Sequence, residues 1–457
     1  MEYHMVRSIG ILFLALIPAV LMFAQGNSEA GSKIFPYAIN QVTLDNGLKI
    51  ISIPFDSPGI IAYYTVVRTG SRNEVEPGKS GFAHFFEHMM FRGTEKYPAE
   101  KFNDVLKAIG ADNNAFTSDD ETVYHTFASS AALEQMMDIE SDRFMNLKYS
   151  EPDFKTESGA ILGEYNKNSS NPFQTIEEKL RDAAYQGHTY KHTTMGFLKD
   201  IENMPNQYEY SLKFFERWYR PENCVVIIVG DFSQQKLIEL AKKYYGNWKQ
   251  GNYSLSVPPE PPQKKEQLVK IPWKAKTLPI LTVAYHGPAF SDKEIDMPAM
   301  DLLSQVYFAQ TSDLYRKLVV EEQIVDALDA ENSDHRDPYL FGIFARIKDQ
   351  KNIEKVRDAI YATIEDAKTK PVSAERLASI KSHVRYQFAM GLDNANSVAN
   401  SIAHYVELTG DPESVNRIYA LYDKITPEDI MNVAKKYFFQ NNRTVALLTQ
   451  ETKEGQK

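Results

Sequence analysis

The chain has 457 residues, enough for two large domains or about three of average size. Its 43% hydrophobic, 25% charged and 12% aromatic residues provide apolar surface for packed cores and exclude a disordered composition. The net charge is −10 with no long basic block, so nucleic acid is not an expected partner, and the single cysteine, Cys224, excludes an internal disulfide and any metal site built from several thiolates.

The amino terminus predicts a secretory signal peptide over 1–30. A polar start precedes an apolar run of fourteen residues from Ile11 to Ala24, and small and polar residues follow. This run is shorter than the roughly 20 residues of a membrane span, so a cleaved signal is favoured over a permanent anchor. Cleavage after Ala24 or Ala30 would leave no stable membrane span. A signal without disulfides fits secretion across a membrane, with the bacterial periplasm as the expected compartment.

The pattern H-x-x-E-H occurs once, at His84, Glu87 and His88. Ser80 is expected to cap a helix here and Gly93 to end it. In a helix the two histidines lie one turn apart on one face with the glutamate beside them, so they can hold a zinc ion while the carboxylate takes a proton from a polarised water. Ordinary packing roles are the alternative, but a chance match is on the order of one in a hundred.

A third zinc ligand has to come from elsewhere, because catalytic zinc usually has three protein ligands. A second helix is predicted after Ser150, with Pro152 in its first turn and Asn171 beyond its end. Glu157 and Glu164 lie seven residues apart in it, about two turns, and therefore point to the same side. One could ligate the metal and the other orient a ligand, although for a lone acidic residue a solvated helix face is the commoner role.

Two halves of similar size are predicted after the signal, over 31–250 and 266–457. The segment 251–265 between them contains four prolines and paired lysines, which suit an extended linker. Strands are expected in similar places of both halves: 41–54, 60–68, 268–272 and 278–285. Long helical patterns fill the middle of each half.

The ends of the two halves look alike. A helical pattern over 208–219 leads through a short turn into an apolar run over 224–229, and 427–438 leads in the same way into 443–448. Superposing Trp218 on Tyr437 keeps both units in register without a gap. The sequence therefore predicts a duplicated α/β domain.

These residues resemble the inverted-zincin metallopeptidases of the pitrilysin family, which includes insulin-degrading enzyme and the mitochondrial processing peptidase. The H-x-x-E-H pattern is followed after 75 intervening residues by Glu164, a gap like that of the family. Further segments that look like family landmarks are Asn46-Gly47-Leu48, Thr69-Gly70-Ser71-Arg72-Asn73-Glu74, Arg220-Pro221-Glu222-Asn223 and Gly230-Asp231. The resemblance extends over nearly the whole mature chain and suggests a half-size, bacterial-type catalytic subunit.

The resemblance implies a function and a site. His84, His88 and Glu164 would bind one Zn²⁺ per chain, Glu87 would be the general base, and Glu157 would be a further glutamate of the catalytic site. The implied fold is α+β, with two homologous α/β domains that form half of a clamshell. The implied activity is that of a zinc endopeptidase that hydrolyses peptides or unfolded proteins by Glu-assisted attack of zinc-bound water.

The segment from Ala111 to His125 resembles the family's edge strand beside the metal. A peptide that adds to such an edge gains main-chain hydrogen bonds that do not depend on its sequence. Asn114 and Ala115 are the expected substrate contacts. Without the resemblance, an ordinary strand with an Asn-rich turn would be the preferred interpretation.

The second half departs from the family in one place. Many active relatives carry an Arg and a Tyr seven residues apart that hold the substrate and its developing oxyanion, but Val319 and Asp326 occupy these positions here. Neither residue can stabilise an oxyanion. We therefore expect a heterodimer with a second half-size family member that supplies the pair, with a homodimer as the alternative.

A non-catalytic role remains as a rival interpretation. The family also contains peptide-binding or assembly subunits of heterodimers, but those usually have a damaged metal motif, whereas the one here is intact. The cleavage preference is not specified by the sequence.

Overall fold

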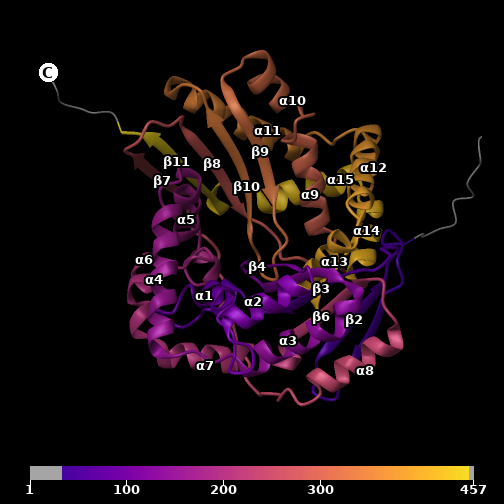
Figure 1. Cartoon of the computed structure of the whole chain (residues 1–457). Coiled ribbons are helices and arrows are strands. Elements are labelled where there is room, and N and C mark those ends of the chain that lie inside the picture. Colours follow the sequence, from indigo (N-terminus) through magenta and orange to yellow (C-terminus); the bar gives the residue numbers. More distant parts are fainter. Residues whose placement is uncertain (1–32, 452–457) are drawn as a thin grey trace, which may run out of the picture. The chain divides into compact units, whose positions relative to one another are not determined.

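The computed structural model describes residues 33–451, which form two mixed β-sheets covered by helices (Figure 1). The secretory signal predicted over 1–30 lies outside these residues. Within them, no helix is both long enough and apolar enough to cross a membrane. The predicted α+β class, with sheets packed by helices, is confirmed.

The first sheet has six strands in the order β1-β2-β6-β3-β5-β4. All neighbours are antiparallel except β2 and β6, and β4 forms one edge. The strands are β1 (Asn40–Thr43), β2 (Lys49–Pro54), β3 (Ile60–Val67), β4 (Asp112–Thr117), β5 (Thr122–Ser129) and β6 (Cys224–Gly230). The α-helices of this half are α1 (Phe82–Met89), α2 (Ala99–Ala108), α3 (Leu133–Asn146), α4 (Glu151–Asn168), α5 (Pro172–Ala184), α6 (Leu198–Asn203), α7 (Tyr208–Trp218) and α8 (Gln234–Tyr245).

The second sheet repeats this arrangement with five strands in the order β7-β11-β8-β10-β9. Again one pair, β7 and β11, is parallel, and β9 forms the edge that corresponds to β4. The strands are β7 (Gln267–Trp273), β8 (Ile280–His286), β9 (Val325–Asn332), β10 (Leu340–Ile347) and β11 (Arg443–Gln450). The α-helices are α9 (Asp296–Tyr307), α10 (Asp313–Tyr315), α11 (Ile353–Thr369), α12 (Ala374–Met390), α13 (Ala395–Thr409), α14 (Ser414–Lys424) and α15 (Pro427–Tyr437).

The two halves exchange helices. Helices α1, α3, α7 and α8 pack on one face of the first sheet, but the other face is covered by α13 and α14 from the second half of the chain. In return, α5 from the first half packs on the face of the second sheet formed by β7, β8 and β11 (Figure 1). The boundary proposed at 251–265 therefore divides the sheets but not the helices that cover them.

The duplicated unit has the register that the sequence predicts. Helix α7 and strand β6 repeat as α15 and β11, with Trp218 and Tyr437 as the last residues of the two helices. Residues 251–264 between the halves contain no helix or strand. Glu260 nevertheless fixes this segment, because its carboxylate accepts hydrogen bonds from the backbone N–H groups of Gln186, Gly187 and His188 at 2.8–2.9 Å.

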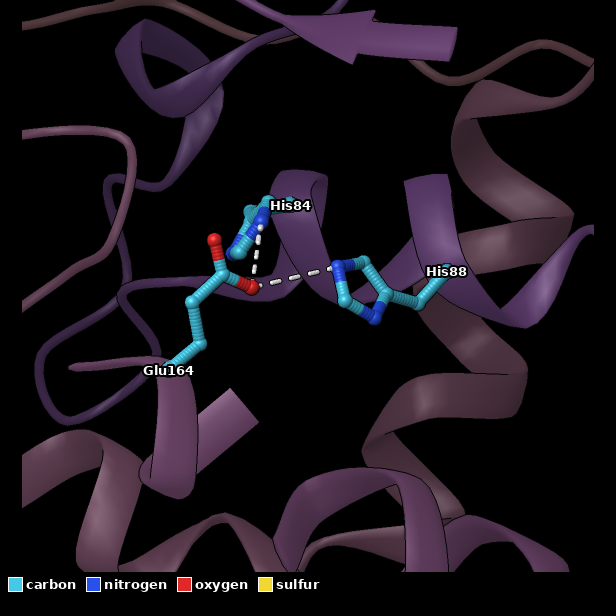
Figure 2. A group of neighbouring side chains, drawn as sticks. All are labelled: His84, His88 and Glu164. Atoms are coloured by element: carbon cyan, nitrogen blue, oxygen red, sulfur yellow. Dashed lines mark ion pairs between the residues drawn. The ribbon is translucent and has the colours of Figure 1, made fainter. Parts of the chain in front are cut away.

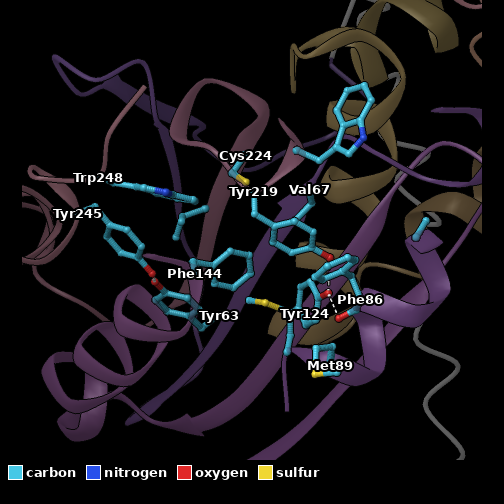
Figure 3. Close-up of a cluster of buried hydrophobic side chains, with 14 of the residues drawn as sticks. Tyr63, Val67, Phe86, Met89, Tyr124, Phe144, Tyr219, Cys224, Tyr245 and Trp248 are labelled. Carbon is cyan, nitrogen blue, oxygen red and sulfur yellow. Dashed lines mark hydrogen bonds between the residues drawn. The ribbon is translucent and has the colours of Figure 1, made fainter. Parts of the chain in front are cut away.

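Buried tyrosines connect the first sheet to its helices (Figure 3). The hydroxyl of Tyr124 on β5 donates to the Phe86 carbonyl of α1 at 3.0 Å and accepts from the hydroxyl of Tyr219 at 2.7 Å. The hydroxyls of Tyr63 and Tyr245 pair in the same core. Since an unpaired buried hydroxyl is costly, the Tyr124 bonds favour one placement of α1 against the sheet, and the Tyr63–Tyr245 pair favours one placement of α8.

Candidate metal centre

Helix α1, which carries the H-x-x-E-H pattern, begins one residue later than predicted. Gly81 is its N-cap, with φ +92°, and Ser80 does not cap the helix because its hydroxyl donates to Asp200 at 2.7 Å. The first turn is capped from a distance instead: the carboxylate of Glu74 accepts from the backbone N–H groups of Gly81 and Ala83 at 2.7 Å each. A buried acceptor thus satisfies the free donors at the helix amino terminus.

The carboxyl end of α1 is also fixed by backbone geometry. The helix ends at Met89, and Gly93, which was predicted to end it, lies in the following turn with φ +87°. A Cβ atom at Gly93 would lie 2.5 Å from the Tyr97 carbonyl oxygen, so only glycine fits. The chain reverses here and keeps the residues after the helix close to it.

Side chains from two helices converge at one point (Figure 2). The Nε2 atoms of His84 and His88 on α1 lie 3.6 Å and 3.4 Å from Oε2 of Glu164 on α4. One ligand atom from each residue lies within 4.8 Å of the others, and no second group of this kind occurs in residues 33–451. The structure therefore brings together the three ligands predicted from sequence.

The donor set fits zinc. A tetrahedral zinc ion bound at about 2.0–2.2 Å holds neighbouring ligand atoms about 3.3–3.6 Å apart, which is the distance from each imidazole nitrogen to the carboxylate oxygen here. Burial, with the charge of His88 adding to it, lowers the pKa of His84 to about 4, so its imidazole is neutral at neutral pH. Neutral imidazole is the form that ligates a metal.

Glu157 lies behind the ligands and orients one of them. Its Oε1 is 2.9 Å from Nδ1 of His88, and its Oε2 accepts from Arg92, with a distance of 2.6 Å to Nε. The side chain of Glu157 is buried, whereas that of Arg92 is half exposed. The tautomer of His88 that donates from Nδ1 to this carboxylate has its Nε2 lone pair free to ligate a metal.

Glu87 forms a hydrogen bond to the edge strand and interacts electrostatically with His88 and Glu164. Its Oε2 accepts a hydrogen bond of 2.6 Å from the hydroxyl of Thr117, the last residue of β4. Burial raises the pKa of Glu87, and the Thr117 hydrogen bond opposes this. A carboxylate with a raised pKa beside a possible metal is suited to accept and return a proton.

Strand β4 presents an open edge, as expected for 112–117 of the predicted segment. Asn114 and Ala115 lie in its middle, and the Ala115 N–H donates to the side-chain Oδ1 of Asn114 at 2.9 Å. This N–H is therefore directed away from β5. A peptide that adds to β4 would replace the Asn114 side chain as its acceptor.

The predicted oxyanion positions of the second half lie outside this site. Val319 is half-buried in a π-helical segment, Arg316–Glu321, and packs against the second core. Asp326 near the start of β9 pairs with Arg346. Neither side chain donates a hydrogen bond toward the three ligands.

Three contributors to the site were not predicted. Arg92, Thr117 and Glu74 each act through a hydrogen bond to Glu157, Glu87 or the first turn of α1. Sequence offered one weak signal, since Arg92 lies one helical turn after His88. The other contacts depend on how the chain packs.

Two segments of the chain match models of known protein families. Residues 61–197 match the model described as insulinase, peptidase family M16, and residues 207–384 match the model described as the peptidase M16 inactive domain. Together the two matches cover more than half of the chain.

Relatives match over most of their length. The chain is 28% identical over 438 residues to the zinc protease PqqE of Helicobacter pylori, covering 94% of this chain and 97% of that protein. It is 23% identical over 416 residues to a probable mitochondrial-processing peptidase subunit beta of Schizosaccharomyces pombe, covering 88% of this chain and 90% of that protein.

Solved structures share the fold. A protease from Helicobacter pylori superposes with a TM-score of 0.84 at 28% identity, covering 90% of this chain and 99% of that one. The periplasmic protease PqqL from Escherichia coli superposes with a TM-score of 0.74 at 21% identity, covering 90% of this chain but 47% of that one. The fold of this chain therefore corresponds to about half of the larger protein.

Proposed function

Because the chain belongs to the M16 peptidase family, we propose that it is a secreted zinc endopeptidase with one catalytic zinc ion held by His84, His88 and Glu164. The observation that supports this most is the convergence of three metal-ligating atoms from α1 and α4 at the spacing of a zinc site. The proposal includes a metal-binding half over 31–250, a linker over 251–265 and a second half over 266–457.

Each residue of the site has a distinct task. Bound zinc would supply a Lewis acid that polarises the scissile carbonyl and lowers the pKa of a water. Glu87 takes the proton of the attacking water and returns it to the leaving amine. Thr117 holds the Glu87 carboxylate at the end of β4, and Glu157 orients His88.

The substrate in this proposal is an extended peptide or unfolded protein. It would add as a strand beside β4, with backbone contacts at Asn114 and Ala115, next to Glu87. Main-chain recognition explains how one site could act on many sequences. Secretion to a bacterial periplasm rests on the amino-terminal sequence and on the likeness to a periplasmic protease.

Glu87→Gln separates binding from chemistry. We expect this variant to keep stoichiometric zinc and lose peptide hydrolysis by about 100-fold or more, because general acid–base catalysis contributes about 10²–10⁴. His88→Ala should lose both zinc and hydrolysis. The measurements are metal analysis and digestion of a peptide library with and without a chelator, with Glu216→Gln on the exposed face of α7 as the matched control. A Glu87→Gln protein that hydrolyses peptides at the wild-type rate would contradict the proposed base.

A non-catalytic or paired role has one specific observation in its favour. Val319 and Asp326 provide no donor for an oxyanion, and the Asp326 carboxylate forms an ion pair with Arg346. We therefore propose that the active form is a heterodimer with a second half-size family member that supplies an Arg and a Tyr. Size measurement with an activity assay tests this: a purified homodimer that cleaves peptides at full rate, with no gain from any co-purifying homologue, would contradict it.

A further inference from the structure

Arg92 makes two contacts that no predicted role explains. Both Nε and Nη2 of its guanidinium donate to Oε2 of Glu157, with 2.6 Å for Nε. The other carboxylate oxygen of Glu157 faces Nδ1 of His88 at 2.9 Å. The carboxylate is therefore divided between the arginine and one proposed zinc ligand.

Because Glu157 is buried, its carboxylate depends on both of these partners. The side chain of Glu157 is only 4% exposed, and a buried carboxylate is costly unless its oxygens are paired. Arg92 is the cation bonded to it, and two guanidinium donors on one oxygen restrict how the carboxylate can rotate. Without Arg92, Oε2 would lose these donors, and the carboxylate could turn away from His88 in search of others.

The chain around Arg92 keeps it in place. Its backbone N–H donates to the Met89 carbonyl at 2.9 Å, and Gly93 after it has φ +87° in the turn that closes the segment. Thr94 then pairs with Leu147 in a β-bridge. Arg92 is thus tied to α1 on one side and to the segment before α4 on the other.

We propose that Arg92 is a positioning residue for the metal site, acting through Glu157 to hold the His88 imidazole with Nε2 directed at the zinc position. This inference rests on the proposed function, because it assumes that zinc binds at His84, His88 and Glu164. Partners behind a histidine ligand typically contribute 10- to 100-fold to metal affinity. Arg92 adds one residue to this series of hydrogen bonds, which runs from the His88 imidazole to the Glu157 carboxylate to the Arg92 guanidinium.

The first experiment measures zinc affinity by competition with a chromophoric chelator. We expect Arg92→Met to weaken zinc binding by about 10-fold or more, and Arg92→Lys, which keeps the charge with one nitrogen, to recover part of the loss. The matched control is Arg357→Met, since Arg357 is a similarly exposed arginine paired with Asp358 in the second half. The control should bind zinc as the wild type does.

A double-variant cycle tests the route through Glu157. If Arg92 acts by orienting Glu157, then Arg92→Met combined with Glu157→Gln should bind zinc no more weakly than Glu157→Gln alone. Additive losses would overturn this route. Thermal unfolding of the metal-free variants gives a second measurement, and a drop in stability with unchanged zinc affinity would make Arg92 a structural residue only.

The outcomes separate this inference from the proposed function. Equal zinc affinity in Arg92→Met and wild type, with weaker affinity in Glu157→Gln, overturns the role of Arg92 and leaves the zinc site standing. A wild-type chain that takes up no zinc overturns the proposed function and the inference with it.

Discussion

Helices α1 and α9 occupy corresponding places in the two halves of the chain. Each follows the strand that pairs antiparallel with the last strand of its sheet, β3 with β6 and β8 with β11. Helix α1 contains two histidines and a glutamate at the proposed metal site, whereas α9 contains no histidine and buries Met300 and Leu303 in the second core. The two halves thus share an architecture, but of these two helices only α1 carries candidate metal ligands, so fold and proposed site are separable here.

Helix α1 also differs from α15 of the second half in how its first turn is capped. The first turn of α1 is capped by Glu74, a buried carboxylate seven residues before Gly81. Helix α15 begins with an exposed local capping box formed by Thr426 and Asp429. Helix α1 is thus held at its start by a distant part of the chain, whereas α15 is held by its neighbours in sequence, as is α4 by the capping box of Ser150 and Asp153.

The strongest test of this comparison is the contact between the halves. Asp119, in the turn after β4, accepts from Ser71 at 2.5 Å, from Arg181 on α5 at 2.7 Å and from His335 of the second half at 3.2 Å. Removing one partner of a buried charge pair costs about 3–5 kcal/mol. We expect Asp119→Asn to lower the free energy of unfolding by an amount in this range, measured by urea denaturation.

Its control is Asp313→Asn, which breaks an exposed pair with Arg316 in the second half. This change should cost less than about 1 kcal/mol. Equal effects of the two variants would show that the Asp119 cluster does not join the halves more firmly than an ordinary surface pair does.

The same cluster predicts an acid sensitivity with a defined sign. Burial alone would raise the pKa of Asp119, but Arg181 and His335 hold it well below its usual value. A lowered carboxyl pKa contributes stability that is present above the unfolded value of about 3.9 and is lost as the pH falls toward the folded value. Wild type should therefore lose stability below about pH 4 more steeply than Asp119→Asn.

Sequence patterns predicted the parts of the fold that depend on local spacing. The sequence predicts the register of α7 and β6 with α15 and β11 correctly. The signals for it are a helical period, a short break and an apolar strand, and all three lie within about 25 residues of one another. The ligand spacing on α1 is local in the same sense.

Contacts between distant segments were not predictable in this way. An amphipathic helix shows that it has a buried face but not which sheet it covers, so the exchange of α5 and α13 between the halves was missed. The predicted cap of α1 was wrong for a related reason. Serine is a common N-cap residue, but the Ser80 hydroxyl donates to Asp200, and Glu74 caps the first turn instead. Thr117 and Arg92 gain their roles through packing of the same kind.

A smaller effect is expected at the two helix starts. In the wild type, the N–H groups of Gly81 and Ala83 donate to different oxygens of Glu74. Glu74→Gln replaces one of these oxygens with an NH₂ group, which is a donor, so one of the two N–H groups loses its acceptor. An unsatisfied buried donor costs about 1–3 kcal/mol, so unfolding should become easier by that amount. Asp429→Asn at the exposed start of α15 should cost about 1 kcal/mol or less, because water can replace the lost contact. Similar losses in both variants would mean that α1 is not held differently from α15.

The smallest effect concerns the strands that close the two repeats. Cys224 begins β6 and is 1% exposed, whereas Arg443 begins β11, is partly exposed and pairs with Glu266. Burial raises the pKa of the Cys224 thiol, so little thiolate is available to react. We expect no reaction with a thiol reagent at about pH 8 in the native protein and complete reaction after denaturation. A cysteine placed on exposed α15 by Lys435→Cys, in a Cys224→Ala background, should react at once. Fast labelling of native Cys224 would contradict the burial of β6 between two layers of helices. It would mean that the start of β6 is as accessible to solvent as the start of β11.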